Sequence, residues 1–309
     1  MKPGSRIYVT GRTKLIGSAL ARRLESEDLD VLSREPDYTN AAEVHDYFQN
    51  ESPDYVFVAA GKSGGIRANQ ERPAELMRDN LQAIQHILPA AHRHGVKKLV
   101  YLASSCVYPR LCTQPMKESD LWSGPLEPTN ESYATAKLTG LQMCRAYRQQ
   151  HDAPFVGIIP TNLFGPGDTF DADNSHVVSA LIRRMDDAKR DGADHIDIWG
   201  TGTPRREFMS VNSFADACVH VMRHYDSDEP INIGSGESHT IAELAESIRD
   251  VVGFEGELRF DTTKPDGMPE KVLDVTKLSA LDWTCAADFK SALEETYTWY
   301  CHSAGVSAV

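Results

Sequence analysis

The feature that most constrains the fold is the alternation of short apolar runs with helical patterns through the first 160 residues. Five runs rich in β-branched residues are predicted to be strands: Arg6–Thr10, Asp30–Ser33, Tyr55–Ala59, Lys98–Ala103 and Phe155–Pro160. Helical patterns separate them, near 17–26, 41–50, 73–94 and 132–150. Such alternation predicts the α/β class with a doubly wound parallel sheet. Ligands bind such sheets at the carboxyl ends of their strands.

After residue 160 the alternation weakens, and turn-forming residues are frequent over 162–205. We therefore predict a Rossmann-like domain over 1–161, with a returning segment near 206–226. The remaining segments, 162–205 and 227–309, are predicted to form a smaller, interleaved C-terminal lobe that binds substrate. Because the segment directly after each strand of a parallel sheet lies at the ligand-binding edge, these segments are where functional residues are expected.

Composition excludes several classes of protein. The 309 residues carry 32 basic and 45 acidic side chains, and the net charge of −13 disfavours nonspecific binding to nucleic acid. No run of about 18 apolar residues predicts a membrane span. The N-terminus enters a predicted strand too early for a signal peptide, so we expect a cytoplasmic protein. Six scattered cysteines lack a CxxC pair or metal-ligand spacing, which indicates reduced thiols and no metal site.

The segment "TGRTKLIG" lies between the first predicted strand and helix. Gly11 and Gly17 have the placement of a dinucleotide-binding loop, in which a helix N-terminus faces a pyrophosphate, although glycine pairs also occur in ordinary tight turns. Lys14 occupies the position of the middle glycine, which normally lets the backbone approach the pyrophosphate closely. After the second strand, Arg34 suits the 2′-phosphate of NADP, although Glu35 adjoins it.

Tyr133 and Lys137, in "SYATAK", are spaced i, i+4 and therefore lie on one face of a predicted helix. A lysine cation near the phenol would lower the pKa of Tyr133, which could then exchange a proton with a carbonyl or alcohol oxygen. Such pairs are also common on ordinary helix surfaces. Ser104, which follows the fourth predicted strand, would hydrogen-bond the same reacting oxygen.

These residues, in this order, resemble the extended short-chain dehydrogenases/reductases. Longer strings, spread from about residue 5 to the last helix, resemble the GDP-L-fucose synthase family: "AAGKSGGIRAN", "SSCVYP", "EPTNESYATAK", "PTNLFGPGD", "NSHVVSALIRR", "WGTGTPRREF" and "KPDGMPEKVLDV". The resemblance implies an NADP-dependent oxidoreductase with epimerase activity. Its substrate would be GDP-4-keto-6-deoxy-D-mannose, epimerised at C3 and C5 through enolate intermediates and then reduced at C4 by NADPH.

The resemblance also implies a homodimer paired through the helices near 73–94 and 132–150. Two other interpretations remain open. A relative acting on another GDP-4-keto-deoxyhexose, as in colitose synthesis, would use the same base and acid. A non-catalytic NADP-binding sensor would keep the fold and lack turnover, and only Lys14 favours it.

Residue roles follow from the resemblance. Cys106 matches the family's base, His176 its acid, and Ser104, Tyr133 and Lys137 the triad that polarises the C4 carbonyl. Outside those motifs, a buried thiol and a structural histidine would be the simpler interpretations. Contacts with NADP(H) are implied for Gly11, Thr13, Lys14, Leu15, Ile16, Gly17, Arg34, Asn80, Ala103, Tyr133, Lys137, Pro160, Asn162, Leu163 and His176. Contacts with substrate are implied for Lys62, Ser104, Cys106, Asn162, Val177, Arg184, Trp199, Arg206 and Lys271.

Two of these positions carry a qualification. Lys14 departs from the family's G-x2-G-x2-G pattern, and a positive φ there would cost about 1 kcal/mol or more. We therefore expect NADP affinity to be altered at Lys14, with the function retained. Trp199 is equally well explained as a core residue.

Overall fold

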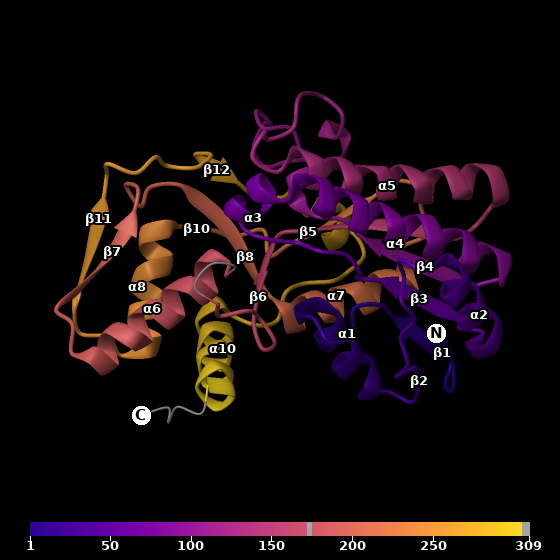
Figure 1. Cartoon of the computed structure of the whole chain (residues 1–309), viewed down its shortest axis with the longest axis horizontal. Helices are drawn as coiled ribbons and strands as arrows, with labels where there is room; N and C mark the ends of the chain where they lie inside the picture. Colours follow the sequence, from indigo (N-terminus) through magenta and orange to yellow (C-terminus); the bar gives the residue numbers. More distant parts are fainter. Residues whose placement is uncertain (172–174, 305–309) are drawn as a thin grey trace.

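The computed structural model describes residues 1–171 and 175–304, and a six-stranded parallel sheet lies at the centre of the larger part (Figure 1). The strand order is β2-β1-β3-β4-β5-β9. The strands are β1 (Arg6–Val9), β2 (Asp30–Val31), β3 (Tyr55–Val58), β4 (Lys98–Leu102), β5 (Phe155–Pro160) and β9 (Ile231–Ile233). The predicted doubly wound α/β fold is confirmed. The order in which the parallel strands are added reverses between β1 and β3, and such sheets bind ligands at this switch point.

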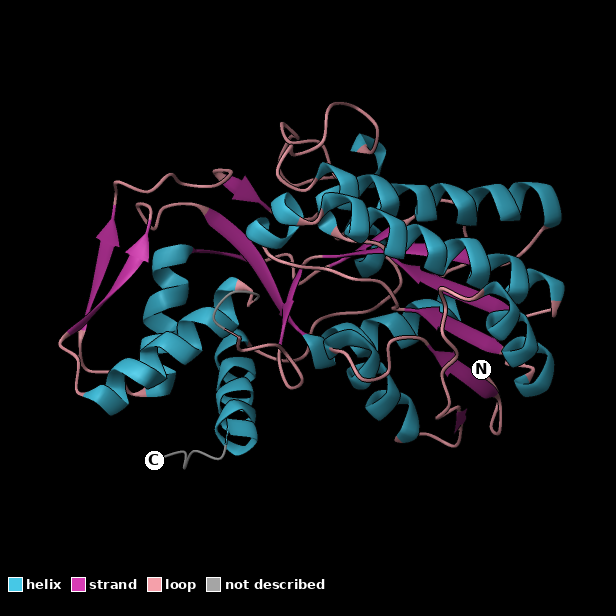
Figure 2. Ribbon diagram, in the orientation of Figure 1, coloured by secondary structure: helices cyan, strands magenta, loops and turns pink. Residues whose placement is uncertain are grey.

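Helices cover both faces of the sheet (Figure 2). One face carries α2 (Ala41–Glu51), α4 (Pro73–Arg93) and α5 (Glu131–His151), and the other carries α1 (Leu15–Glu25) and α7 (Val211–His224). An apolar core lies on each face of the sheet, and alternate residues of β4 point into one or the other. Leu99 and Tyr101 face α4 and α5, whereas Val100 and Leu102 face α1 and α7. The short α3 (Ile66–Glu71) precedes α4.

The second part of the molecule has a separate apolar core. Helices α6 (Val177–Asp191), α8 (Ile241–Val252) and α10 (Phe289–Ala304) contribute to it. A small sheet contains β6 (Asn162–Phe164), β8 (Arg205–Ser210), β10 (Ser238–Thr240) and β12 (Glu270–Lys271), and β7 (His195–Trp199) pairs with β11 (Glu257–Asp261). The remaining elements are η1 (Ser105–Val107), η2 (Glu118–Asp120) and α9 (Thr276–Ser279). None of the helices within 1–171 and 175–304 combines the length and apolar character needed to cross a membrane.

One detail of the predicted domain division is wrong. Strand β9 lies inside 227–309, which the sequence assigned to the substrate lobe, yet it pairs with β5 and completes the large sheet. Ile231 and Ile233 are fully buried in the core that α1 and α7 cover. A three-residue strand carries too short a pattern to reveal its partner from sequence. The rest of the division into two lobes stays a prediction.

Helix α5 lies unusually close to β4 because Gly140 has no side chain. A Cβ at Gly140 would lie 2.2 Å from Cζ of Tyr101, whose ring is buried in β4. The Tyr101 hydroxyl donates to the carbonyl oxygen of Lys137, one turn earlier in α5, at 3.4 Å. This packing fixes the first turns of α5 against the carboxyl end of β4.

We predict that Gly140→Ala lowers the free energy of unfolding by about 1–3 kcal/mol, because the added methyl group would overlap the Tyr101 ring. Urea denaturation of the full chain measures this change. Gly65→Ala is the matched control, since a Cβ at Gly65 meets nothing within 4 Å, and its effect should stay within about 0.5 kcal/mol. A more stable Gly140→Ala protein, as expected for an unobstructed helix glycine, would contradict the close approach.

Candidate active site

The loop between β1 and α1 has the features needed to hold a pyrophosphate. Gly11 has a φ of +68°, which favours glycine, and a Cβ at Gly17 would lie 2.2 Å from the Gly11 carbonyl oxygen. The first turn of α1 contains no acidic residue, and the Lys14 side chain makes no capping hydrogen bond. The unpaired amides at this helix N-terminus therefore face an anion-binding position, and these residues fit a dinucleotide cofactor.

Lys14 adopts ordinary extended backbone, with a φ of −102°. The positive φ that would have strained this residue is absent, because Lys14 serves as the N-cap of α1. Its N–H donates to the Gly11 carbonyl oxygen at 2.9 Å, and its own carbonyl oxygen accepts from Ser18 at 2.8 Å. The side chain is exposed, so its ammonium is available to an anion beside the loop.

Three charged residues lie where the end of β2 meets this loop: Arg34 and Glu35 follow β2, and Arg12 belongs to the loop. The Glu35 carboxylate accepts a hydrogen bond from the Gly11 N–H, whereas Arg34 is exposed. Arg12, which was not predicted as a site residue, donates to the Leu32 carbonyl oxygen at 3.3 Å and also pairs with Glu25, so it lies at the same edge. Its place directly after Gly11 was the available signal. Two guanidinium groups at this edge suit an additional phosphate.

A buried acceptor lies between β3 and α4. The Asn80 amide donates to the carbonyl oxygens of Lys62 and Leu76, both at 2.8 Å, but its Oδ1 is buried and no described residue hydrogen-bonds it. A Cβ at Gly61 would lie 2.2 Å from that oxygen. The Lys62 ammonium, predicted to contact substrate, pairs with Asp79 at 2.5 Å.

The predicted residues at the ends of β4 and β5 are placed close to the sheet edge. Ala103 follows β4, and Pro160 is the last residue of β5; both are buried. Leu163 and Asn162 lie in β6, and the Asn162 amide donates to the Glu207 carbonyl oxygen at 2.8 Å. Asn162 therefore links the large sheet to β8.

The predicted triad is brought together where α5 begins. The Lys137 ammonium donates to the Leu102 carbonyl oxygen at 3.1 Å and lies 5.9 Å from the centre of the Tyr133 ring. Burial lowers the pKa of Lys137 to about 8. The pKa of Tyr133 is raised, first by burial and then by the nearby Cys106, while the Ser104 hydroxyl partly offsets the rise. The expected lowering of the Tyr133 pKa is therefore wrong, because burial of the phenol disfavours its charged form.

Two donors surround the sulfur of Cys106, which lies in η1 beside the triad. The Asn130 amide nitrogen is 3.2 Å from Sγ, and the Lys271 ammonium is 3.9 Å from it. Lys271 comes from β12, which pairs with β8. Lys271 was predicted to contact a diphosphate, and the structure places it at the thiol. Asn130 was not predicted as a site residue.

The buried carboxylate of Glu207, in β8, positions the segment that carries Lys271. The Glu207 carboxylate accepts from the amides of Leu273 at 2.9 Å and Gly236 at 2.8 Å, so it fixes the chain just after Lys271. Burial raises the pKa of Glu207, and these hydrogen bonds lower it in part. The neighbouring Arg206 has a pKa lowered by burial; its guanidinium donates to the Arg205 carbonyl oxygen at 2.7 Å and forms no ion pair with a carboxylate among the described residues.

The other predicted substrate contacts lie in the second part of the molecule. His176 and Val177 are exposed at the start of α6, and within the described residues no hydrogen bond joins His176 to Cys106. Arg184 donates to a carbonyl oxygen of β7. Trp199, at the end of β7, is 72% exposed, so the core interpretation of this residue is wrong.

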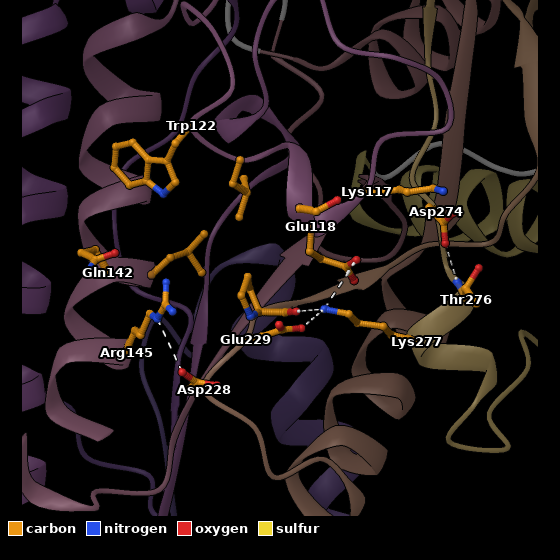
Figure 3. Close-up of a pocket in the computed structure, with 14 residues that line it drawn as sticks. Lys117, Glu118, Trp122, Gln142, Arg145, Asp228, Glu229, Asp274, Thr276 and Lys277 are labelled. Atoms are coloured by element: carbon orange, nitrogen blue, oxygen red, sulfur yellow. Dashed lines mark hydrogen bonds and ion pairs between the residues drawn. The ribbon is translucent and has the colours of Figure 1, made fainter. Parts of the chain in front are cut away.

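A separate cavity is formed by η2, α5 and the segments 228–230 and 274–277 (Figure 3). Ion pairs cross it between Lys277 and Glu229 at 2.7 Å and between Arg145 and Asp228 at 3.5 Å. None of the predicted site residues lines this cavity. It is therefore distinct from the candidate active site.

Comparison with known proteins identifies the family of this chain. The model of the NAD dependent epimerase/dehydratase family matches residues 7–234. The chain belongs to this family. Within the NAD dependent epimerase/dehydratase family, it is 47% identical over 304 residues to a putative GDP-L-fucose synthase 2 of Arabidopsis thaliana, covering 97% of this chain and 93% of the relative. It is 42% identical over 308 residues to the GDP-L-fucose synthase of Escherichia coli, covering 96% of each.

Two further similar proteins are a curated relative with another named product and a solved structure. A GDP-L-colitose synthase of Yersinia pseudotuberculosis is 33% identical over 300 residues, covering 96% of this chain and 97% of the relative. The crystal structure of a GDP-L-fucose synthetase from Naegleria fowleri bound to NADP has a TM-score of 0.91 at 28% identity. That match covers 100% of this chain and 98% of the solved one.

We predict that Arg206→Met leaves the free energy of unfolding unchanged or raises it by up to about 1 kcal/mol, because it removes a half-buried cation with no carboxylate partner. The same variant should bind GDP about 10–100-fold more weakly if a diphosphate is the missing partner. Urea denaturation and calorimetric titration measure the two effects.

Arg205→Met is the matched control, since Arg205 has a carboxylate partner: its guanidinium lies 3.8 Å from Glu243, and Nε donates to the Ser238 hydroxyl at 3.0 Å. This variant should lose some stability and keep its affinity for GDP. Unchanged GDP binding by Arg206→Met would remove Arg206 from the site.

Proposed function

We propose that the chain is an NADPH-dependent epimerase/reductase that converts GDP-4-keto-6-deoxy-D-mannose to GDP-L-fucose. The observation that carries the proposal is the grouping of a cysteine sulfur with a Ser-Tyr-Lys triad, in one place, at the sheet edge that also holds the glycine loop. Proton abstraction beside a carbonyl and hydride addition to that carbonyl require these two sets of groups to share one substrate position. The relatives named above support this substrate.

Epimerisation begins in this proposal with Cys106 as the base that removes a proton from the carbon next to the C4 carbonyl. His176 returns a proton to the opposite face, which inverts the carbon. Ser104 and Tyr133 hydrogen-bond the carbonyl oxygen and stabilise the enolate that forms on it. The same arrangement acts at C3 and at C5.

Reduction uses the same oxygen position. Bound NADPH supplies the hydride for C4. Tyr133 donates a proton to the oxygen, and its raised pKa keeps the phenol protonated and able to donate. Lys137, whose pKa is about 8, is mostly cationic at neutral pH and stabilises the phenolate as it forms.

Substrate and cofactor binding require local positive charge on an acidic chain. We assign the GDP diphosphate to Arg206, whose guanidinium has no described carboxylate partner, with Lys271 nearby. Asn162, Lys62, Val177, Arg184 and Trp199 are proposed further contacts. The glycine loop (11–17) and Asn80 would hold NADP, with Arg12 and Arg34 at its 2′-phosphate, while Ala103, Pro160 and Leu163 border it.

The assembly and location are also proposals. Helices α4 and α5 pack side by side over one face of the large sheet, and Figure 2 shows them on the outside of the molecule. We propose that this pair of helices meets its copy in a homodimer. We further propose that the protein acts in the cytoplasm, without nucleic-acid or membrane partners.

A related substrate remains as the second candidate, because a GDP-L-colitose synthase is among the relatives. The decisive experiment mixes the protein with NADPH and GDP-4-keto-6-deoxy-D-mannose in deuterated water. We expect GDP-L-fucose, one NADPH oxidised per product, and deuterium at both C3 and C5. A product reduced at C4 without deuterium at C3 would contradict the proposal and favour the colitose-type reaction.

The control for this experiment compares two cysteines. Cys106→Ser should lower deuterium incorporation about 10²–10⁴-fold through loss of the base. Cys112→Ser should leave it unchanged, because the pKa of the Cys112 thiol is raised to about 11 by burial and by Asp120, so this thiol stays protonated. Equal losses in both variants would argue against Cys106 as the base.

A further inference from the structure

Asn130 occupies the N-cap position of α5 but does not cap the helix. Asparagine is favoured at this position because its side-chain oxygen accepts hydrogen bonds from the second and third amides of the helix. Asn40 does so at the start of α2, where Oδ1 accepts from Ala42 at 3.1 Å and from Glu43 at 3.4 Å. The Asn130 side chain makes no such bond. Folding of α5 alone therefore does not explain its conformation.

The Asn130 side chain turns instead to the sulfur of Cys106. Its amide nitrogen donates to Sγ at 3.2 Å, while its Oδ1 is buried with no hydrogen-bond partner among the described residues. A buried acceptor without a partner is destabilising, and capping α5 would have satisfied it. The side chain thus adopts an orientation that is unfavourable for stability and places an N–H donor at the sulfur. A side chain that lowers stability in order to hold a donor at a reactive atom is typical of functional positions.

We propose that Asn130 is a positioning residue that holds the Cys106 sulfur toward the substrate and favours its deprotonated form. The inference rests on the proposed function, in which Cys106 removes the substrate proton. A thiolate accepts hydrogen bonds more strongly than a thiol, so an N–H donor fixed at 3.2 Å stabilises the reactive state. The amide does so without adding charge, and Lys271, at 3.9 Å, supplies the cation.

The first test measures alkylation of Cys106 by iodoacetamide at pH 7 in the free protein, followed by mass spectrometry of the Cys106 peptide. Asn130→Ala should alkylate about threefold more slowly, or slower still. Loss of a hydrogen bond to a charged group lowers the thiolate population about tenfold, and the greater nucleophilicity of the remaining thiolate offsets part of this loss. A merely structural role would leave alkylation unchanged or accelerate it by loosening the site.

Asn130→Asp is a second variant that keeps the test valid if Asn130→Ala fails to fold. Aspartate has the same size and caps helices well, so the melting temperature should stay close to that of the wild type. Its carboxylate replaces the N–H donor and repels the thiolate, so alkylation should be slower than in Asn130→Ala. Asn40→Ala, which removes an ordinary cap, is the matched control and should leave Cys106 alkylation unchanged.

The second test measures turnover in deuterated water. Both Asn130 variants should lose deuterium incorporation at C3 and C5 about tenfold in kcat, while the KM for NADPH stays unchanged. The alkylation test needs no substrate, so it remains valid if the protein acts on another sugar. Cys106 alkylation at the wild-type rate or faster in folded Asn130→Asp would overturn the inference, whatever the outcome for the proposed function.

Discussion

The close packing of α5 on β4 is the constraint on which the site depends. With only a hydrogen at Gly140, α5 approaches the Tyr101 ring, and the Lys137 ammonium reaches the last carbonyl group of β4. The position of Lys137 in turn sets that of Tyr133, one helical turn earlier. Ser104 and Cys106 follow β4 directly, so the same contact brings the triad to the sulfur.

Electrostatic balance explains how an acidic chain can hold an anionic substrate. Many surface cations have carboxylate partners, as in the pair between Arg23 and Glu27 at 2.7 Å. At the proposed substrate position, Arg206 has no described carboxylate partner and Lys271 has a thiol as its neighbour. Glu207 holds these segments through backbone amides, so its buried charge is satisfied without neutralising the cations. The local excess of positive charge is therefore built by the fold.

Sequence predicted the parts of this molecule that depend on local patterns. The strands β1 to β5 and the helices that cover them follow from periodicity, whereas β9 does not, and Tyr133 and Lys137 share a face because their spacing requires it. Three properties needed three-dimensional information. Lys14 is unstrained because it caps α1 in extended conformation, the Tyr133 pKa depends on burial, and Lys271 meets Cys106 through a strand pairing. Asn130 was missed because a helix cap and an active-site donor look identical in sequence.

The central claim is that a single oxygen position serves both epimerisation and reduction. The most direct measurement compares Tyr133→Phe with the wild type in deuterated water, recording deuterium incorporation at C3 and C5 together with NADPH oxidation. If Tyr133 stabilises the enolate as well as protonating the product, both rates should fall together, each by at least about tenfold. Deuterium incorporation at the wild-type rate, with only NADPH oxidation lost, would show that the two reactions use separate positions and would contradict the account.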